Sequence, residues 1–210
     1  MYINEKFLNY AFKDEIIVPQ NCGNITIKKQ NLGLLNLPTG KIVANDPCVF
    51  FETEEFTVKV EPGIYPVSIS IAEFSENGDK VVAFAMIKFS GSKPVKWAMA
   101  LIDGQGLECL SGDSFYGYGV DSGVGGFMDK SIADKVLASD LDLYDIFEGQ
   151  FNKTHNGDYS YASGNITGSG NSDIIAFSSG YGDGAYPSYF GYDESGKVCS
   201  LVTEFFVIEG

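Results

Sequence analysis

The sequence predicts a β-rich α+β fold of mostly antiparallel, sandwich-like sheets, with one helical segment near 131–151 and a short N-terminal helix. Short apolar runs alternate with turn residues along most of the chain, whereas helical periodicity is confined to these two places. With 44% apolar residues among 210, the chain can bury a sizeable core. We therefore expect a single domain over residues 1–210.

The N-terminal part of the chain begins with a helix predicted over 4–12, in which Phe7, Leu8 and Phe12 share one side. Short strands of this part are separated by turn residues such as Pro38-Thr39-Gly40. They are predicted over 25–28, 32–37, 41–44 and 56–60.

Three longer runs, 65–74, 81–89 and 95–102, predict an antiparallel meander. Asn77-Gly78 supplies the residues with positive φ that a tight hairpin between the first two runs requires. The second and third runs are apolar on both faces, which is typical of central strands that are covered on each side.

The C-terminal part contains the longer helical segment, for which Ser131 is the expected cap and Ser139-Asp140 the expected break. A polar, glycine-rich stretch over 152–170 predicts a surface loop. Further strands, which bring the expected total to about ten, are predicted over 174–177, 186–192 and 198–208.

Two stretches rich in glycine, aspartate and aromatic residues stand apart from these elements: residues 111–130, the first Gly-Asp segment, and residues 178–191, the second. The first holds six glycines and three aspartates in twenty residues, a mixture unfavourable to a helix or a regular strand. Such backbone permits the close approach of a ligand or of another segment. We predict that the two segments meet in space and form one exposed feature.

The charge of the chain restricts its partners. Fourteen lysines, no arginine and 28 acidic residues give a net charge of -14. Residues 1–110 contribute 10 lysines and 13 acids, and residues 111–210 contribute 4 lysines and 15 acids, so the second part carries -11. Nucleic acid and phosphoryl substrates are unexpected partners, since arginine is the usual bidentate ligand for phosphate. An acidic surface that serves only solubility is the alternative interpretation.

The first residues lack the basic start and apolar run of a signal peptide, and no window has the apolar length of a membrane span. We expect a cytoplasmic protein without membrane contact. The four cysteines are far apart and form no C-x-x-C pair, which favours buried free thiols over a zinc or redox site.

The motifs of common enzyme classes are absent. No P-loop, dinucleotide fingerprint or G-x-S-x-G elbow occurs, and the single histidine, His155, lies in a polar loop. Asp121-Ser122-Gly123 matches the D-[ST]-G of aspartic proteases, but the second copy that such an enzyme needs is missing.

The remaining candidates for a site are carboxylates on glycine-rich backbone, joined by aromatic side chains that could stack on a ligand. Asp121, Asp129 and Asp183 are the candidate ligands for Ca²⁺ or Mg²⁺, although no cofactor is predicted, and Asp46 is a further candidate in a loop. Aspartates beside glycines also form turns and helix caps, which is the structural alternative. The predicted ligand- or partner-binding residues are Asp113, Tyr116, Tyr118, Asp121, Asp129, Tyr181, Asp183 and Tyr186.

Several sequence segments together resemble a largely bacterial family of uncharacterised proteins, domain of unknown function 4241. The segments are LPTGKIVANDP at 37–47, PGIYPVSISIA at 62–72, VKWAMAL at 95–101, YGVDSGVGGFMD at 118–129 and SSGYGDGAYPSYFGYDESGKV at 178–198. The resemblance runs from about residue 30 to the C-terminus; it implies a single domain and carries no established activity. The positions it marks as family-defining are Gly40, Asp46, Pro47, Asp121, Gly123, Asp129, Gly182, Asp183, Gly184 and Gly191.

Two functional hypotheses follow. The first is a non-enzymatic binding protein whose acidic C-terminal half engages a basic protein partner, as an immunity or inhibitor protein would. The second is a carboxylate- or metal-assisted hydrolase acting at Asp121, Asp129 and Asp183, which requires these side chains to converge in one pocket.

Overall fold

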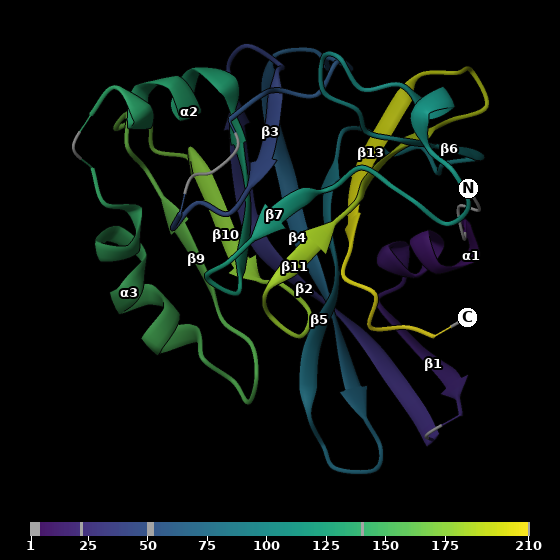
Figure 1. The fold of residues 1–210 in the computed structure, drawn as a ribbon. Helices are drawn as coiled ribbons and strands as arrows, with labels where there is room; N and C mark the ends of the chain where they lie inside the picture. The colour runs from purple at the N-terminus through teal and green to yellow at the C-terminus, as the bar shows by residue number, and fades with distance from the viewer. Residues whose placement is uncertain (1–4, 22, 50–52, 140, 210) are drawn as a thin grey trace.

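Two antiparallel sheets face each other in the computed structural model, which describes residues 5–21, 23–49, 53–139 and 141–209 (Figure 1). Seven strands form the larger sheet, in the order β1-β2-β4-β5-β13-β12-β6, and four form the smaller sheet, in the order β3-β8-β10-β9. A separate pair, β7 and β11, crosses the front of the molecule in Figure 1. The prediction of a β-rich α+β fold with mostly antiparallel sheets is confirmed.

The larger sheet contains β1 (Glu15–Gln20), β2 (Gly23–Leu37), β4 (Gly63–Phe74), β5 (Lys80–Lys88), β6 (Lys96–Met99), β12 (Ser188–Tyr192) and β13 (Val198–Glu204). The smaller sheet contains β3 (Ile42–Asn45), β8 (Val124–Asp129), β9 (Tyr161–Gly164) and β10 (Ile174–Ser178). The separate pair is β7 (Tyr118–Val120) and β11 (Gly184–Tyr186). The helices are α1 (Glu5–Leu8), α2 (Lys130–Leu137) and α3 (Leu143–Thr154), with 3₁₀ turns η1 (Asn9–Phe12) and η2 (Leu107–Cys109).

The smaller sheet separates two hydrophobic cores, because successive side chains of a strand point to opposite faces. Along β10, Ile175 and Phe177 face the main core shared with the larger sheet, whereas Ile174 and Ala176 face a second core beneath α2 and α3. Figure 1 shows both helices on that outer side of β9 and β10. The described helices include none with the length and apolar character needed to cross a membrane.

The predicted three-stranded meander is only partly correct. β4 and β5 pair through the hairpin at Asn77-Gly78, with Glu73 opposite Lys80. β5, however, pairs with the C-terminal strand β13, and β6 lies at the edge of the sheet, where it pairs with β12. β13 is buried along nearly its whole length, so its place beside the buried β5 covers more apolar surface than an exposed edge would.

Three strand boundaries also differ from the prediction. The runs 25–28 and 32–37 form one long strand, β2, which accommodates a bulge between Asn31 and Gly33. The run 56–60 forms only an isolated bridge between Phe56 and Ile102. The run 186–192 is divided at Pro187, because proline has no N–H group to donate to a neighbouring strand.

The helical segment near 131–151 forms two helices, α2 and α3, with a break at Ser139 as predicted; Asp140 lies outside the described residues. The cap prediction is wrong, because Asp129 caps α2 and accepts a hydrogen bond from the backbone N–H of Ser131. The N-terminal helix prediction is confirmed by α1 and η1, apart from residue 4, which is not described.

The first Gly-Asp segment contains regular strands, β7 and β8, which sequence reasoning did not expect. Its glycines allow the sheet to pack closely. A Cβ atom at Gly125 would lie 2.7 Å from the hydroxyl of Tyr118, and one at Gly126 would lie 3.1 Å from the ring of Pro47. The missing side chains therefore permit tertiary packing rather than disorder of the backbone.

Candidate functional site

The two Gly-Asp segments meet, as predicted, through the antiparallel pairing of β7 with β11. Tyr118 lies opposite Tyr186, and Gly119 lies opposite Ala185. Glycine is required beside this pairing, because a Cβ atom at Gly117 would lie 2.6 Å from the carbonyl group of Tyr186. The chain thereby pairs two strands that are more than sixty residues apart in sequence.

A buried aspartate fixes the turn between β7 and β8. Asp46 is 1% exposed, and its carboxylate accepts hydrogen bonds from the backbone N–H groups of Asp121 (3.0 Å) and Ser122 (2.8 Å). The hydroxyl of Ser122 donates a further bond of 2.7 Å, and the N–H of Cys48 donates one of 2.9 Å. Asp46, a candidate ligand in the sequence, therefore has a structural role.

Asp129 does not join Asp121 and Asp183 at the surface. It is buried, and its carboxylate accepts hydrogen bonds from the N–H (2.9 Å) and the hydroxyl (2.8 Å) of Thr39 as well as from Ser131. The role is that of a helix cap that also anchors the turn before β3. The carboxylate of Asp129, predicted as a partner-binding or metal-binding group, is therefore engaged by donors of the fold itself.

The other predicted carboxylates, Asp113, Asp121 and Asp183, are exposed. Within the described ranges, no group of three or more His, Cys, Asp and Glu side chains is arranged to hold a metal ion. The convergence of Asp121, Asp129 and Asp183 that the hydrolase hypothesis requires is thus absent from the structure.

Three of the predicted tyrosines line a small cavity of about 20 Å³ between β7, β11 and the larger sheet. The volume suffices for one water molecule and for no larger ligand. Tyr116 donates its hydroxyl proton to the carbonyl of Gly106 (3.2 Å), and Tyr186 donates to that of Gly182 (2.8 Å). Burial raises the pKa of Tyr186, and the charge of Asp183 adds to this shift.

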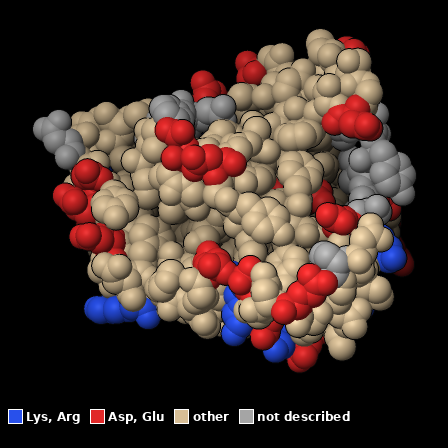
Figure 2. Space-filling model, turned by 60° about the horizontal axis from the view of Figure 1, so that its bottom comes forward, with Lys and Arg blue, Asp and Glu red and all other residues tan. Residues whose placement is uncertain are grey.

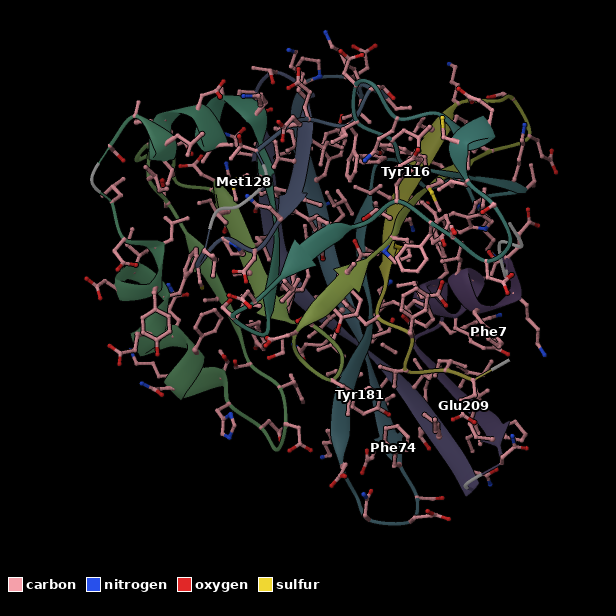
Figure 3. The ribbon with its side chains drawn as sticks, in the orientation of Figure 1. Phe7, Phe74, Tyr116, Met128, Tyr181 and Glu209 are labelled. Atoms are coloured by element: carbon pink, nitrogen blue, oxygen red, sulfur yellow. The ribbon has the colours of Figure 1, made fainter. Side chains whose placement is uncertain are left out.

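These tyrosines therefore pack in the interior and do not form an open platform for a ligand. Tyr118 is only 4% exposed, and burial raises the pKa of its hydroxyl far above the ordinary range. Tyr181 differs from them, because 70% of its surface is exposed; it lies in the lower half of the view in Figure 3.

The larger hollow at the junction of the two segments lies beside Tyr181. This Tyr181 groove has a volume of about 350 Å³, and its lining residues are Asp79, Val81, Gly123, Asp158, Ser178, Gly180, Tyr181 and Gly182. The two segments touch here, since the N–H of Ser179 donates to the carbonyl of Gly123 at 3.1 Å. The groove combines two carboxylates, one exposed aromatic ring and glycine backbone.

The carboxylates of the groove come from two loops that are joined to each other. Asp79 lies in the β4–β5 hairpin, and Asp158 lies in the loop between α3 and β9. The backbone N–H of Lys80 donates to Asp158 at 3.4 Å, which holds the two loops together. On the face that includes this end of the molecule, Asp and Glu clearly outnumber Lys (Figure 2).

Sequence reasoning missed Asp79 and Asp158, although the chain carries a signal for them. Each aspartate ends an Asn-Gly-Asp tripeptide, at 77–79 and at 156–158, and this tripeptide occurs nowhere else in the chain. An Asn-Gly turn forms the tip of a surface loop, and the aspartate that follows it lies where the loop closes. The repeated tripeptide could therefore have indicated two exposed carboxylates in similar settings.

The family of the protein follows from its sequence over most of its length. Residues 35–203 match the family described as Protein of unknown function (DUF4241), and this range includes both Gly-Asp segments and the whole Tyr181 groove. Comparison with curated proteins and with solved structures gives no match. The expected family resemblance is confirmed, and the chain belongs to the DUF4241 family.

Proposed function

We propose that this protein binds a basic polypeptide segment in the Tyr181 groove, in the way that an inhibitor or immunity protein engages its target. The observation that carries the proposal is a hollow of about 350 Å³ at the junction of the two Gly-Asp segments, lined by the carboxylates of Asp79 and Asp158 and by an exposed tyrosine. Lysine side chains suit this lining, because carboxylates attract the ammonium group and a tyrosine ring stabilises a nearby cation.

The charge distribution of the whole chain supports the same partner. Residues 111–210 carry a net charge of -11, so the surface around the groove would steer a cationic partner toward it. The ammonium group of Lys80, the basic residue beside the two loops, lies 4.0 Å from the carboxylate of Glu73. This carboxylate offsets the positive charge of Lys80. Electrostatic attraction of this kind raises the rate of association more than it raises affinity. The attraction weakens as salt screens the charges.

The test uses a fluorescent oligolysine peptide and the change in its anisotropy on titration with the protein. At about 0.1 M salt, where charges act over about 10 Å, we expect saturable binding; at about 1 M salt, where the range is about 3 Å, we expect most of it to be lost. The double variant Asp79→Asn/Asp158→Asn should bind about three- to tenfold more weakly.

The matched control removes the same charge from another surface. Asp103→Asn/Glu108→Gln changes two exposed carboxylates in the loop that precedes the first Gly-Asp segment. This control should bind oligolysine like the unmodified protein. Equal weakening by both double variants would show that oligolysine responds only to net charge, and the proposal of a specific groove would be withdrawn.

A further inference from the structure

The helices α2 and α3 carry more apolar surface than the fold uses. Ile132, Val136 and Phe147 are buried against the outer face of the smaller sheet and complete the second core. Leu137 and Leu141 remain 57% and 44% exposed, although they lie in the same short helical region. Both leucines line the same surface hollow, so they form one exposed apolar patch rather than scattered side chains.

These leucines border a hollow that differs from the Tyr181 groove in its chemistry. The α2–α3 groove has a volume of about 370 Å³, and its apolar lining includes Pro47, Val49, Leu137 and Leu141. Its floor is fixed, because Asp46 holds the turn at 47–49 through bonds from Cys48 and Val49. The hollow is therefore formed before any partner arrives.

The charges at the border of the groove indicate what occupies it. Among the described residues of the lining, Asp142 alone is charged, and its carboxylate caps α3 through the N–H of Tyr144 at 2.9 Å. Farther along α3, Asp145 and Glu148 are exposed as well. An apolar partner with basic flanks is complementary to both features.

We propose that the α2–α3 groove is a second docking surface, which accepts a lysine- or arginine-bearing amphipathic helix of a partner protein. Leu137 and Leu141 contact the apolar side of the helix, and Asp142 with the acidic face of α3 pairs with its basic side. The inference does not depend on the Tyr181 groove, since the two hollows share no residue.

The experiment uses a labelled helical peptide of about 14 residues, four turns long, made of leucine on one side and lysine on the other. Every protein carries Asp79→Asn/Asp158→Asn, so that the Tyr181 groove contributes little. We expect Leu137→Ser/Leu141→Ser to weaken binding about tenfold in an anisotropy titration. The control Leu34→Ser/Ile64→Ser removes two equally exposed apolar side chains from the larger sheet and should leave the affinity unchanged.

Three results would overturn the inference. Equal binding by the Leu137→Ser/Leu141→Ser variant would show that the peptide does not use this groove. Equal binding of a lysine–serine peptide would show attraction by charge alone. A dimer in sedimentation velocity that the variant abolishes would assign the groove to a second copy of the chain. Should the double variant fail to fold, Leu141→Ser alone, in the connection between the helices, is expected to weaken binding severalfold.

Discussion

The carboxylate of Asp46 accepts hydrogen bonds from both the backbone N–H and the hydroxyl of Ser122, at 2.8 and 2.7 Å. A buried, charged side chain at the end of β3 thereby fixes the turn between β7 and β8, seventy-six residues later in the sequence. Gly123, which follows Ser122, lines the Tyr181 groove and accepts a hydrogen bond from the second Gly-Asp segment. The shape of the groove therefore depends on a residue that does not line it.

Replacing Asp46 with alanine should destabilise the protein by at least about 3 kcal/mol. Several part-buried N–H groups and one hydroxyl group would lose their acceptor at once, and hydrogen bonds to a charged group contribute about 1.5–3 kcal/mol each. Urea denaturation measures the change. The control Asp121→Ala, at an exposed carboxylate, should alter stability by less than about 0.5 kcal/mol. Similar stabilities for the two variants would contradict the role given to Asp46.

Replacing Gly117 with alanine should separate the two Gly-Asp segments. The new Cβ atom would lie 2.6 Å from the carbonyl group of Tyr186, so the backbone of β7 or β11 must move. We expect faster hydrogen exchange in 118–120 and 184–186 and weaker oligolysine binding. Gly119→Ala is the matched control, because a Cβ atom there has no neighbour within 4 Å. Equal exchange rates in the two variants would argue against close packing at Gly117.

The stability of the protein should depend on the protonation of Glu204, which lies at the end of β13. Burial raises the pKa of this carboxyl group from its ordinary value to about 7. The folded state therefore binds the proton more tightly than the unfolded state. The contribution of this proton to the free energy of unfolding is about 3 kcal/mol. It is fully present below about pH 4 and is lost as the pH rises to about 7.

Urea denaturation at several pH values tests this dependence. Glu204→Gln should be more stable than the unmodified protein at pH values above about 7, and the advantage should vanish in acid. The exposed Glu209→Gln is the control, and it should follow the unmodified protein across the range. If the stability of Glu204→Gln and that of the unmodified protein change with pH in parallel, the protonation of Glu204 does not contribute to the pH dependence of stability.

Tyr181→Ala should weaken oligolysine binding about two- to fivefold without lowering the melting temperature. The ring is 70% exposed, and a cation above an exposed ring is stabilised by about 0.5–1 kcal/mol. Tyr144, half exposed on α3, provides the control Tyr144→Ala. An unchanged affinity for Tyr181→Ala would remove the aromatic ring from the proposed site, while the carboxylates could still be tested separately.

The sequence predicts local features of the fold well. The hairpin at Asn77-Gly78 and the break at Ser139 depend on turn geometry and helical periodicity, which neighbouring residues determine. The pairing of β5 with β13 could not be predicted, because it joins strands more than a hundred residues apart and both are buried on each face. Local patterns carry no information about which of several apolar strands becomes the neighbour.

The sequence predicts the location of the candidate site and one of its residues, Tyr181, but not its carboxylates. Glycine and aspartate composition indicates that the two segments belong together, and the pairing of β7 with β11 agrees. Composition does not distinguish a buried aspartate such as Asp129 from an exposed one such as Asp183, because the difference depends on donors from distant turns. Asp79 and Asp158 reach the groove from loops outside both segments.

Cross-linking position 119 to position 185 tests directly whether the two Gly-Asp segments are neighbours in the folded protein. Residues opposite each other in an antiparallel pair have Cα atoms about 4.5–5.5 Å apart, within the range that a disulfide spans. The variant Gly119→Cys/Ala185→Cys would be made with Cys22 and Cys109 replaced by serine. Cys48 should not interfere, because burial and the charge of Asp46 raise its pKa to about 11.

On mild oxidation of the folded double variant, we predict an intramolecular disulfide between the two introduced cysteines, one in each segment, detected by mass spectrometry of proteolytic fragments. The oxidised protein should retain oligolysine binding, since neither substituted position lines the Tyr181 groove. If the two new thiols stay reduced and react separately with an alkylating reagent in the native protein, the segments are not neighbours, and the proposed groove between them does not exist.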